Sequence, residues 1–302
     1  MKCYSCGNPA VIYRKYEGRA WCKKHFSRQL ESKIKATIKK DKLVEKGDKI
    51  CVALSGGKDS CLTLYLMDKF FGKRPDINVF ALSIDEGIKG YRDESIKKAR
   101  KLCKKLNIPF HLYSFKEEFG KTMDEILKNK EARACTYCGV FRRYILNKKS
   151  RELGATRLAT GHNLDDEIQS IFINNLKGDT NRLMRLGAKP VAVKKDFVNR
   201  IKPLRYIPEK ETTLYAMLNG IEFHDSRCPN AEDSVRFDVR KFLNDMEEKY
   251  PGTKHIIICH FDTILPALRK YFADKGSVGV CPKCGEPTSR ALCKVCELLE
   301  NL

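Results

Sequence analysis

The sequence lacks the features of a membrane-spanning or secreted protein. No stretch of the chain approaches the roughly 18 consecutive apolar residues that a membrane span requires. The N-terminal segment MKCYSC has no apolar core of the kind that signal peptides carry. We therefore expect a cytoplasmic protein without membrane contact.

Low-complexity tracts are also missing, and hydrophobic residues make up 42% of the chain, which argues against intrinsic disorder. Acidic residues are scarce relative to basic ones. The chain has 38 Asp and Glu against 59 Lys and Arg, a net charge of +21. This surplus favours a polyanionic partner such as nucleic acid, although a lysine-rich solvated surface would give the same count.

Cysteine, in contrast, is abundant, with 14 residues. Because cytoplasmic thiols stay reduced, clustered cysteines there indicate metal binding or catalysis more often than disulfides. A set near each end has two closely spaced ligand pairs, which suits tetrahedral Zn²⁺, and full ligation predicts a structural rather than a catalytic ion. The expected ligands are Cys3, Cys6, Cys22 and His25 in the first set, and Cys281, Cys284, Cys293 and Cys296 in the second.

Between these ends, strand and helix patterns alternate. Such alternation predicts an α/β fold with a doubly wound parallel sheet covered on both faces, where ligands bind beyond the carboxyl ends of the strands. We expect strands at 49–54, 78–84, 110–115 and 157–160, and helices at 61–71, 94–106, 140–153, 164–176, 209–219 and 235–248. The expected domains are an N-terminal zinc module (1–25), a basic linker helix (26–48), the α/β domain (49–274) and a C-terminal zinc ribbon (275–302).

A glycine-containing loop, Ser55-Gly-Gly-Lys-Asp-Ser60, follows the first strand of the α/β domain and opens a helix. Glycines let the backbone approach a phosphate, free N–H groups point at it, and the helix dipole favours its charge. The loop is not G-x-x-x-x-G-K-[ST], because Asp59 follows the lysine where that motif needs Ser or Thr. An ordinary strand-to-helix turn is the plainer alternative.

SGGKDS resembles the pyrophosphate loop of the PP-loop ATP-pyrophosphatases, and TGHNLDDE (160–167) resembles their second motif. The resemblance implies an enzyme that cuts ATP between the alpha and beta phosphates and adenylates a substrate oxygen. It ties Asp166, or less directly Asp165, to Mg²⁺ or to activation, whereas acidic residues in a first helical turn can simply complement the dipole. The implied ATP-binding residues are Ala53, Ser55, Gly56, Gly57, Lys58, Asp59, Ser60, Ser83 near the adenine, Gly161, His162 and Asp166.

A third cysteine set lies within the α/β domain. Cys135-Thr-Tyr-Cys138 alone could be half a zinc site, a redox pair or packing. Its surroundings, CTYCGVFRRYILN (135–147), together with DEGIKGYRD (85–93) and Cys228 in SRCPNA, resemble the PP-loop tRNA thiolases. The NcsA-type archaeal enzymes and their eukaryotic cytosolic counterparts are the most similar subgroup, and the resemblance covers nearly the whole chain.

This resemblance implies a [4Fe–4S] cluster held by Cys135, Cys138 and Cys228, with one iron left open for an exogenous sulfide. A persulfide on one of these cysteines, resolved by another as a disulfide, is the competing chemistry. A structural zinc ion is the third alternative, although such sites normally have four ligands. The position of Arg142 lies near the reacting base in related thiolases and is often Lys. Arginine cannot act as a base, so it would orient phosphate or polarise the base carbonyl, unless it is only a solvated surface residue.

We therefore predict an ATP-dependent tRNA 2-thiouridine synthetase that adenylates uridine O2 and replaces it with sulfur, most consistently at the wobble uridine. The alternatives are a T-loop uridine, an amidating PP-loop ligase, and a non-catalytic zinc-ribbon RNA-binding protein. The resemblance also implies a homodimer and, as sulfur donor, a ubiquitin-like carrier protein or free sulfide. We expect tRNA phosphates to bind the basic N-terminal module and Arg182, Arg185, Lys189, Lys194, Lys195, Arg200, Lys202 and Arg205. We expect structural roles for His111, His224, His255 and His260, and for Cys51, Cys61, Cys103 and Cys259.

Overall fold

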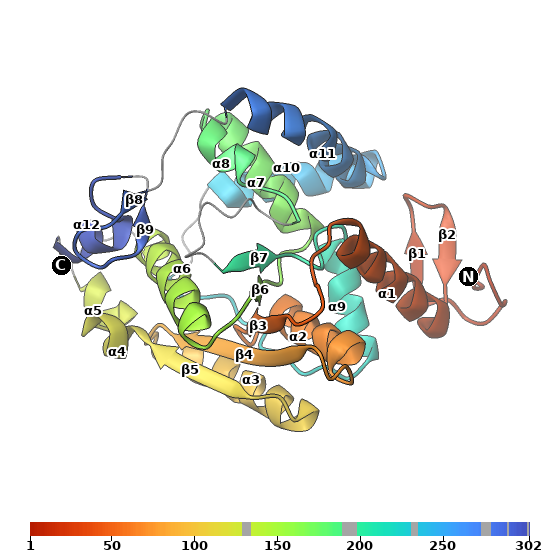
Figure 1. The fold of residues 1–302 in the computed structure, drawn as a ribbon. Helices are drawn as coiled ribbons and strands as arrows, with labels where there is room; N and C mark the ends of the chain where they lie inside the picture. Colours follow the sequence, from red (N-terminus) through yellow and green to blue (C-terminus); the bar gives the residue numbers. More distant parts are fainter. Residues whose placement is uncertain (129–133, 189–197, 231–234, 273–278, 289, 301) are drawn as a thin grey trace.

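A parallel sheet of five strands forms the centre of the molecule (Figure 1). The computed structural model describes residues 1–128, 134–188, 198–230, 235–272, 279–288, 290–300 and 302. The strands are β3 (Lys49–Ala53), β4 (Asn78–Asp85), β5 (Phe110–Ser114), β6 (Arg157–Ala159) and β7 (Asn199–Ile201). They lie in the order β5-β4-β3-β6-β7, so the chain moves outward from β3 in one direction and then in the other. The predicted doubly wound α/β fold is confirmed.

Helices cover both faces of this sheet, as the fully buried residues of β3 require. One face packs against α1 (Lys23–Lys40), α2 (Lys58–Phe71), α3 (Arg92–Leu106) and α9 (Glu209–Leu218). The other packs against α4 (Phe115–Phe119), α5 (Met123–Leu127) and α6 (Ala134–Glu152). A third core lies between α7 (Leu164–Leu176), α8 (Thr180–Met184), α10 (Val235–Lys249) and α11 (Thr253–Phe272).

The two cysteine modules lie on opposite sides of the molecule (Figure 1). The N-terminal hairpin, β1 (Ile12–Arg14) and β2 (Arg19–Trp21), leads directly into α1 and shares its core. The C-terminal module contains β8 (Gly279–Val280), β9 (Pro287–Thr288) and α12 (Lys294–Glu300), and it packs on α6. Its Glu286 accepts hydrogen bonds from Asn147 and Arg151 of that helix.

The predicted linker helix differs from the observed one. Helix α1 already begins at Lys23, so the zinc-ligand candidate His25 lies in its first turn. It ends at Lys40 rather than near residue 48, because Lys42 adopts a left-handed backbone (φ +46°) that no helix continues through. The next residue, Leu43, is fully buried and anchors the connection to β3.

Several other elements were missed or misplaced by sequence reasoning. Helices α4 and α5 each begin with a capping box, Ser114 with Glu117 and Thr122 with Glu125, which is a readable signal. Helix α6 starts at Ala134, so the C-x-x-C pair lies inside its first turns rather than before it. The short strand β7 and the long helix α11 were not predicted. None of the described helices is long and apolar enough to cross a membrane.

Candidate active site

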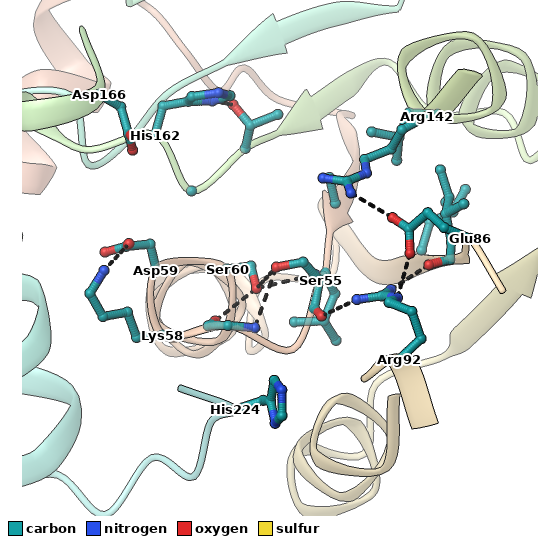
Figure 2. A pocket seen from close by; sticks show the side chains of 18 of the residues that line it. Ser55, Lys58, Asp59, Ser60, Glu86, Arg92, Arg142, His162, Asp166 and His224 are labelled. Atoms are coloured by element: carbon teal, nitrogen blue, oxygen red, sulfur yellow. Dashed lines mark hydrogen bonds and ion pairs between the residues drawn. The ribbon is translucent and has the colours of Figure 1, made fainter. Parts of the chain in front are cut away.

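A cavity of about 530 Å³ opens at the carboxyl ends of β3, β4 and β6, where the strand order reverses (Figure 2). Parallel sheets of this kind bind ligands at that edge, because loops and helix N-termini converge there. The cavity is lined by residues of the 55–60 loop, the end of β4, helix α6, the turn after β6 and the segment 224–226. Among the sequence-predicted residues it brings together Ala53, Ser55, Gly57, Lys58, Asp59, Ser60, Arg142, Gly161, His162 and Asp166.

Hydrogen bonds of Ser55 and Ser60 hold the shape of the 55–60 loop. Ser60 Oγ accepts a hydrogen bond from the Ser55 backbone N–H (3.1 Å) and donates to the Gly57 carbonyl (2.9 Å), and the two serine hydroxyls lie 3.0 Å apart. Helix α2 begins immediately afterwards, at Lys58. Backbone N–H groups and the positive end of the helix dipole therefore face the cavity, which is the arrangement that binds phosphate.

Two glycines allow close approaches around the loop. Gly56 has a φ of +86°, and a Cβ there would lie 2.1 Å from the Ser95 carbonyl oxygen. A Cβ on Gly161 would lie 2.7 Å from the Asp59 backbone, so only glycine lets the turn after β6 press against the start of α2. The Gly56 carbonyl in turn accepts a hydrogen bond from the His224 N–H (2.8 Å).

The three acidic residues at the start of α7, residues 165–167, lie in three different environments. Asp165 is buried, pairs with Lys254, and accepts the Glu209 backbone N–H (2.7 Å). Glu167 is buried against Lys202 and Arg205. These two carboxylates are therefore already neutralised by partners within the chain, whereas Asp166 is left to face the cavity.

Asp166 is electrostatically unusual. Burial and the negative charges of Asp59 and Glu209 together raise its pKa to about 6, against the lowering effects of the Asn163 backbone and Arg236. Its nearest cation, the Arg236 guanidinium, is 3.9 Å away. Neighbouring His162 is kept neutral, because burial and Lys202 lower its pKa to about 4. The carboxylates of Asp166 and Asp59 both line the cavity, and carboxylate oxygens are the donors that a hard divalent cation prefers.

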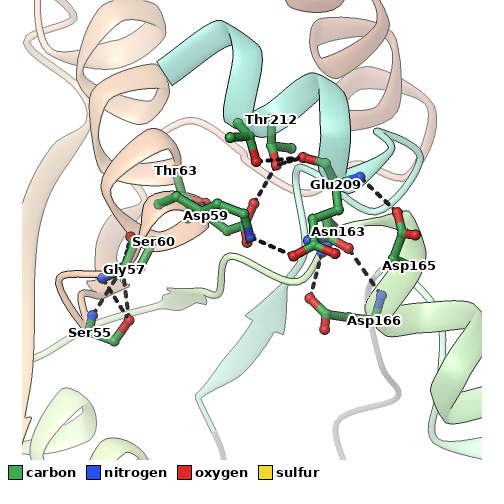
Figure 3. A network of polar contacts seen from close by, with 12 residues as sticks. Ser55, Gly57, Asp59, Ser60, Thr63, Asn163, Asp165, Asp166, Glu209 and Thr212 are labelled. Atoms are coloured by element: carbon green, nitrogen blue, oxygen red, sulfur yellow. Dashed lines mark hydrogen bonds and ion pairs between the residues drawn. The ribbon is translucent and has the colours of Figure 1, made fainter. Parts of the chain in front are cut away.

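Asp59 joins the loop to helix α9 (Figure 3). It accepts a hydrogen bond from the Thr212 hydroxyl (2.6 Å) and pairs with Lys58 (2.8 Å). The Lys58 ammonium also pairs with Glu209 (2.8 Å). The lysine that would meet a phosphate is thus positioned by two carboxylates on separate elements.

Glu86, which sequence reasoning did not single out, links the loop to the cysteine-bearing helix. It is 1% exposed and pairs with Arg92 (2.5 Å) and Arg142 (2.7 Å). Arg92 donates to the Ser55 carbonyl (2.9 Å), and Arg142 donates to Cys138 Sγ (3.1 Å). Figure 2 shows the resulting chain from Ser55 through Arg92 and Glu86 to Arg142. The only sequence signal was the position of Glu86 within the DEGI string.

The three mid-chain cysteines gather at the side of the cavity formed by α6. Cys138 is half-buried; burial raises its pKa, while Arg142 lowers it and the negative charges of Glu86 and Cys228 raise it. Cys228 is carried there by the segment that pairs with Gly57 at His224. Cys135 is exposed, with its Sγ 3.9 Å from the Asn230 carbonyl oxygen. Three accessible thiols at one rim fit a cluster that keeps an open iron.

The terminal cysteine sets are more compact. In each, the four ligand atoms lie within 4.8 Å of one another. Cys3 and Cys22 Sγ are each 3.4 Å from His25 Nδ1, and Cys284 and Cys293 Sγ are 3.5 Å apart. Zn–S bonds of about 2.3 Å in a tetrahedron need sulfurs roughly 3.8 Å apart, so both sets fit zinc. Across the described residues these are the two groups of this compactness, and Cys135, Cys138 and Cys228 do not form a third.

Three expectations about individual residues need correction. Ser83 does not line the cavity: it is 1% exposed and donates its hydroxyl to the Leu54 carbonyl, while its neighbours Leu82 and Ile84 face the cavity. His224, expected to be purely structural, lies in the cavity wall with its ring against Tyr91. The third correction concerns the basic residues between 182 and 205.

Lys202 and Arg205, expected to meet tRNA phosphates, are buried and pair with Glu167, and Arg205 also pairs with Asp262 (2.7 Å). Their charges are therefore neutralised by carboxylates inside the protein. Arg182 and Arg185 are exposed. Lys189, Lys194 and Lys195 lie outside the described residues.

The chain matches two protein families. Residues 26–247 match the PP-loop domain, and residues 2–27 match the N-terminal LIM domain of the 2-thiouridine synthetase TtuA. Among curated proteins, it is 35% identical to the tRNA 2-thiolation protein NcsA of Haloferax volcanii, across 100% of this chain and 99% of that protein. It is 37% identical to the cytoplasmic tRNA 2-thiolation protein 1 of Drosophila grimshawi, across 98% of this chain and 86% of that one.

A solved structure resembles the whole chain. The U34-tRNA thiolase NcsA of Methanococcus maripaludis, solved with its [4Fe–4S] cluster, superposes with a TM-score of 0.87 at 35% identity and covers 100% of this chain and 96% of that one. The family domain, the full-length relatives and this fold agree with the geometry of the cavity. The chain belongs to the PP-loop family and, within it, to the NcsA-type tRNA thiolases.

Proposed function

We propose that this protein is an ATP-dependent tRNA 2-thiouridine synthetase. One observation carries the proposal: a phosphate-binding loop and the Asp166 carboxylate line one cavity, and Arg142 in the same lining donates a hydrogen bond to Cys138. An amidating ligase would use the loop without needing the thiols. A non-catalytic RNA-binding protein would need neither.

In this proposal the loop binds ATP. The backbone N–H groups of Gly56 and Gly57, the hydroxyls of Ser55 and Ser60, and the Lys58 ammonium hold the beta and gamma phosphates. Because the helix N-terminus and Lys58 already face the cavity, the developing charge on pyrophosphate is stabilised without rearrangement. Uridine O2 attacks the alpha phosphorus, the bond to the beta phosphate breaks, and pyrophosphate leaves.

Asp166 and Asp59 would hold Mg²⁺ between them. Their mutual repulsion in the free protein supports this assignment, because a divalent cation relieves it. The ion would neutralise phosphate oxygens beside the alpha phosphorus. Asp165, neutralised by Lys254, is not part of this proposed site.

Cys135, Cys138 and Cys228 would hold a [4Fe–4S] cluster. When bound by three thiolates, such a cluster presents one open iron at which exogenous sulfide can be held. The sulfur forms a bond to C2 of the adenylated base, the C2–O2 bond breaks, and AMP leaves carrying the original oxygen. The relative solved with such a cluster supports this assignment.

Arg142 would orient the base. Glu86 fixes its guanidinium at the rim between the loop and Cys138, and its charge cannot be lost by deprotonation. A fixed cation there stabilises negative charge that develops on the adenylated oxygen. We therefore assign Arg142 an electrostatic role rather than proton transfer.

The assignment of the wobble uridine rests on relatives whose names specify tRNA 2-thiolation or U34. We propose zinc in both terminal modules, because their ligand atoms have tetrahedral zinc spacing. A homodimer, a ubiquitin-like sulfur carrier and a cytoplasmic location complete the proposal. Family resemblance supports the first two, and the name of the Drosophila relative supports the third.

The test uses the Ser55→Ala, Asp59→Ala double variant, which alters the loop without removing any cysteine. We expect tRNA-dependent pyrophosphate release to be abolished, while the iron content, the zinc content and the circular dichroism spectrum stay unchanged. Mass spectrometry of tRNA from a strain lacking the gene should show which uridine loses its 2-thio group. Wild-type rates in a folded double variant would show that ATP binds elsewhere, and unaltered tRNA in the strain would refute the thiolation function.

A further inference from the structure

Two arginines beside the cavity have no partner of opposite charge among the residues that the structure describes. Most arginines near it do: Arg92 and Arg142 pair with Glu86, and Arg205 pairs with Glu167. Arg143 and Arg200 differ, because no carboxylate in the described part of the chain forms an ion pair or hydrogen bond with either. Uncompensated guanidinium groups next to a site are a recurring sign of an anionic ligand.

The fold places these two side chains together. The Val198 N–H, just before β7, donates to Asn147 Oδ1 of α6, and Val198 packs in the core on that face of the sheet. Side chains two residues apart on a strand point to the same face, so Arg200 also faces α6, while Ile201 packs on the opposite face.

The spacing of residues along β7 and α6 brings Arg200 and Arg143 to the same level. A helix that crosses between parallel strands runs antiparallel to them. Two residues along β7 advance about 6.6 Å, and four residues back along α6 advance about 6 Å. Moving from the Val198–Asn147 contact in this way leads to Arg200 on the strand and Arg143 on the helix.

The surroundings of the pair are positively charged. Burial and the charge of Arg143 together lower the pKa of Arg200 to about 10. The pKa of Arg143 is lowered by burial and by the charges of Arg182 and Arg142. Arg143 is nevertheless exposed and Arg200 half-buried, so an incoming anion can reach both. Binding an anion would relieve a repulsion that exists in the free protein.

The position of the pair indicates which anion. Arg142, the preceding residue, lines the cavity, and the Arg143 guanidinium folds back against Gly139, which follows Cys138. A nucleotide whose base enters the cavity must leave its flanking phosphates at this rim. Planar guanidinium groups bind phosphate oxygens in bidentate fashion.

We propose that Arg143 and Arg200 together bind one backbone phosphate of the tRNA, next to the nucleotide whose base enters the cavity. This inference rests on the proposed function, since it assumes a tRNA substrate. It assigns the site to a single phosphodiester rather than to the leaving pyrophosphate, which shares the same chemistry.

The test measures binding of an unmodified tRNA transcript, without ATP, from about 50 to 300 mM salt. The Arg143→Gln, Arg200→Gln variant should bind roughly ten- to hundredfold more weakly. The slope of log affinity against log salt should become shallower by about one, because one phosphate contact is lost. Removal of the mutual repulsion should leave the Tm of the free protein unchanged or raise it, whereas loss of a structural ion pair would lower it.

The matched control is Lys104→Gln, Lys105→Gln, which removes two exposed charges from α3 on the opposite face of the sheet. It should change affinity by less than about threefold. A second variant, Arg143→Lys with Arg200→Lys, keeps the charges but loses the planar forks, so it should recover only part of the affinity.

Three results would overturn the inference: unchanged tRNA affinity, equal weakening by the control, or a lowered Tm. Loss of product inhibition by added pyrophosphate with intact tRNA affinity would assign the pair to pyrophosphate and overturn it too. Failure of the proposed function is separate. It would show as a wild-type protein that binds tRNA but produces no thiolated nucleoside with ATP and sulfide.

Discussion

The terminal cysteine modules and the central cavity are built in opposite ways. Each module draws all four ligands from one short segment, 3–25 or 281–296, and brings their ligand atoms within 4.8 Å. The cavity draws its residues from segments between Ala53 and Ser226, contributed by two strands, four helices and the connecting loops. The candidate ligands of a module can therefore come together through local chain geometry, whereas the cavity exists only when the whole α/β domain is folded.

The two regions are nevertheless in contact. The C-terminal module packs on α6, the helix that carries Cys135 and Cys138, through Glu286. The N-terminal module leads into α1, whose apolar side belongs to the core on the opposite face of the sheet. The two candidate ligand sets therefore lie in modules that pack on opposite faces of the sheet, and neither set lines the cavity.

The strongest effect should come from substitutions that distinguish the proposed iron site at the mid-chain cysteines from the proposed zinc sites in the terminal modules. Cys138→Ala should remove iron and abolish thiolation while two zinc ions per chain remain, because the terminal ligand sets are complete without it. Cys293→Ser should remove one zinc ion and lower the Tm, yet keep iron. Elemental analysis of anaerobically purified variants measures both. Loss of zinc in Cys138→Ala would show that the regions are not independent.

The same comparison distinguishes the cluster from persulfide chemistry. We expect iron-free enzyme supplied with sulfide, ATP and tRNA to be inactive. Full turnover under those conditions would contradict the cluster mechanism. A trapped disulfide between two of the three mid-chain cysteines would then identify the persulfide pair.

The next effect concerns two adjacent carboxylates. Asp166→Asn should abolish activity yet stabilise the metal-free protein near pH 7–8. Its folded-state pKa of about 6 lies above the ordinary value of 3.8, so the contribution of Asp166 to stability is greatest below pH 4 and is lost as pH rises through 6. The advantage of the variant should therefore vanish below pH 4. Thermal melts across this range, without Mg²⁺, measure it.

Asp165→Asn is the matched control. It leaves the buried Lys254 ammonium without its partner, so it should destabilise the protein by about 3–5 kcal/mol at neutral pH. Equal melting shifts in the two variants would contradict the different environments assigned to these neighbours.

The smallest of these effects concerns Glu86. Glu86→Gln should lower kcat roughly ten- to hundredfold, because Arg142 and Arg92 lose the carboxylate that orients them. It should also lower stability, since Arg92 is buried. The measurement is single-turnover thiolation at saturating ATP.

Glu118→Gln is its control. That residue also fixes α6, through Lys148 and Lys149, but away from the cavity. It should affect melting without an effect on kcat beyond about twofold. Equal losses of kcat in both variants would mean that Glu86 acts only by holding the helix.

Sequence reasoning succeeded where short-range chemistry decides the structure. The 55–60 loop lies between β3 and α2 because a strand, two glycines and a helix start follow one another. The α/β class follows from alternating periodicities, and the terminal ligand sets follow from spacing. It failed at β7, where two of the three residues are polar, and at the end of α1, where Lys42 adopts a left-handed backbone.

The loop, the fold class and the candidate metal-ligand sets could be predicted from the sequence, because each depends on residues that are neighbours along the chain. Which carboxylate of the turn 165–167 faces the cavity depends on the tertiary structure, since Lys254, Lys202 and Arg205 come from distant elements to neutralise the others. It also decided that Glu86 joins the loop to Cys138 and that Ser83 points away. Side-chain roles depend on what packs against each residue, and residues far apart in the sequence supply those partners.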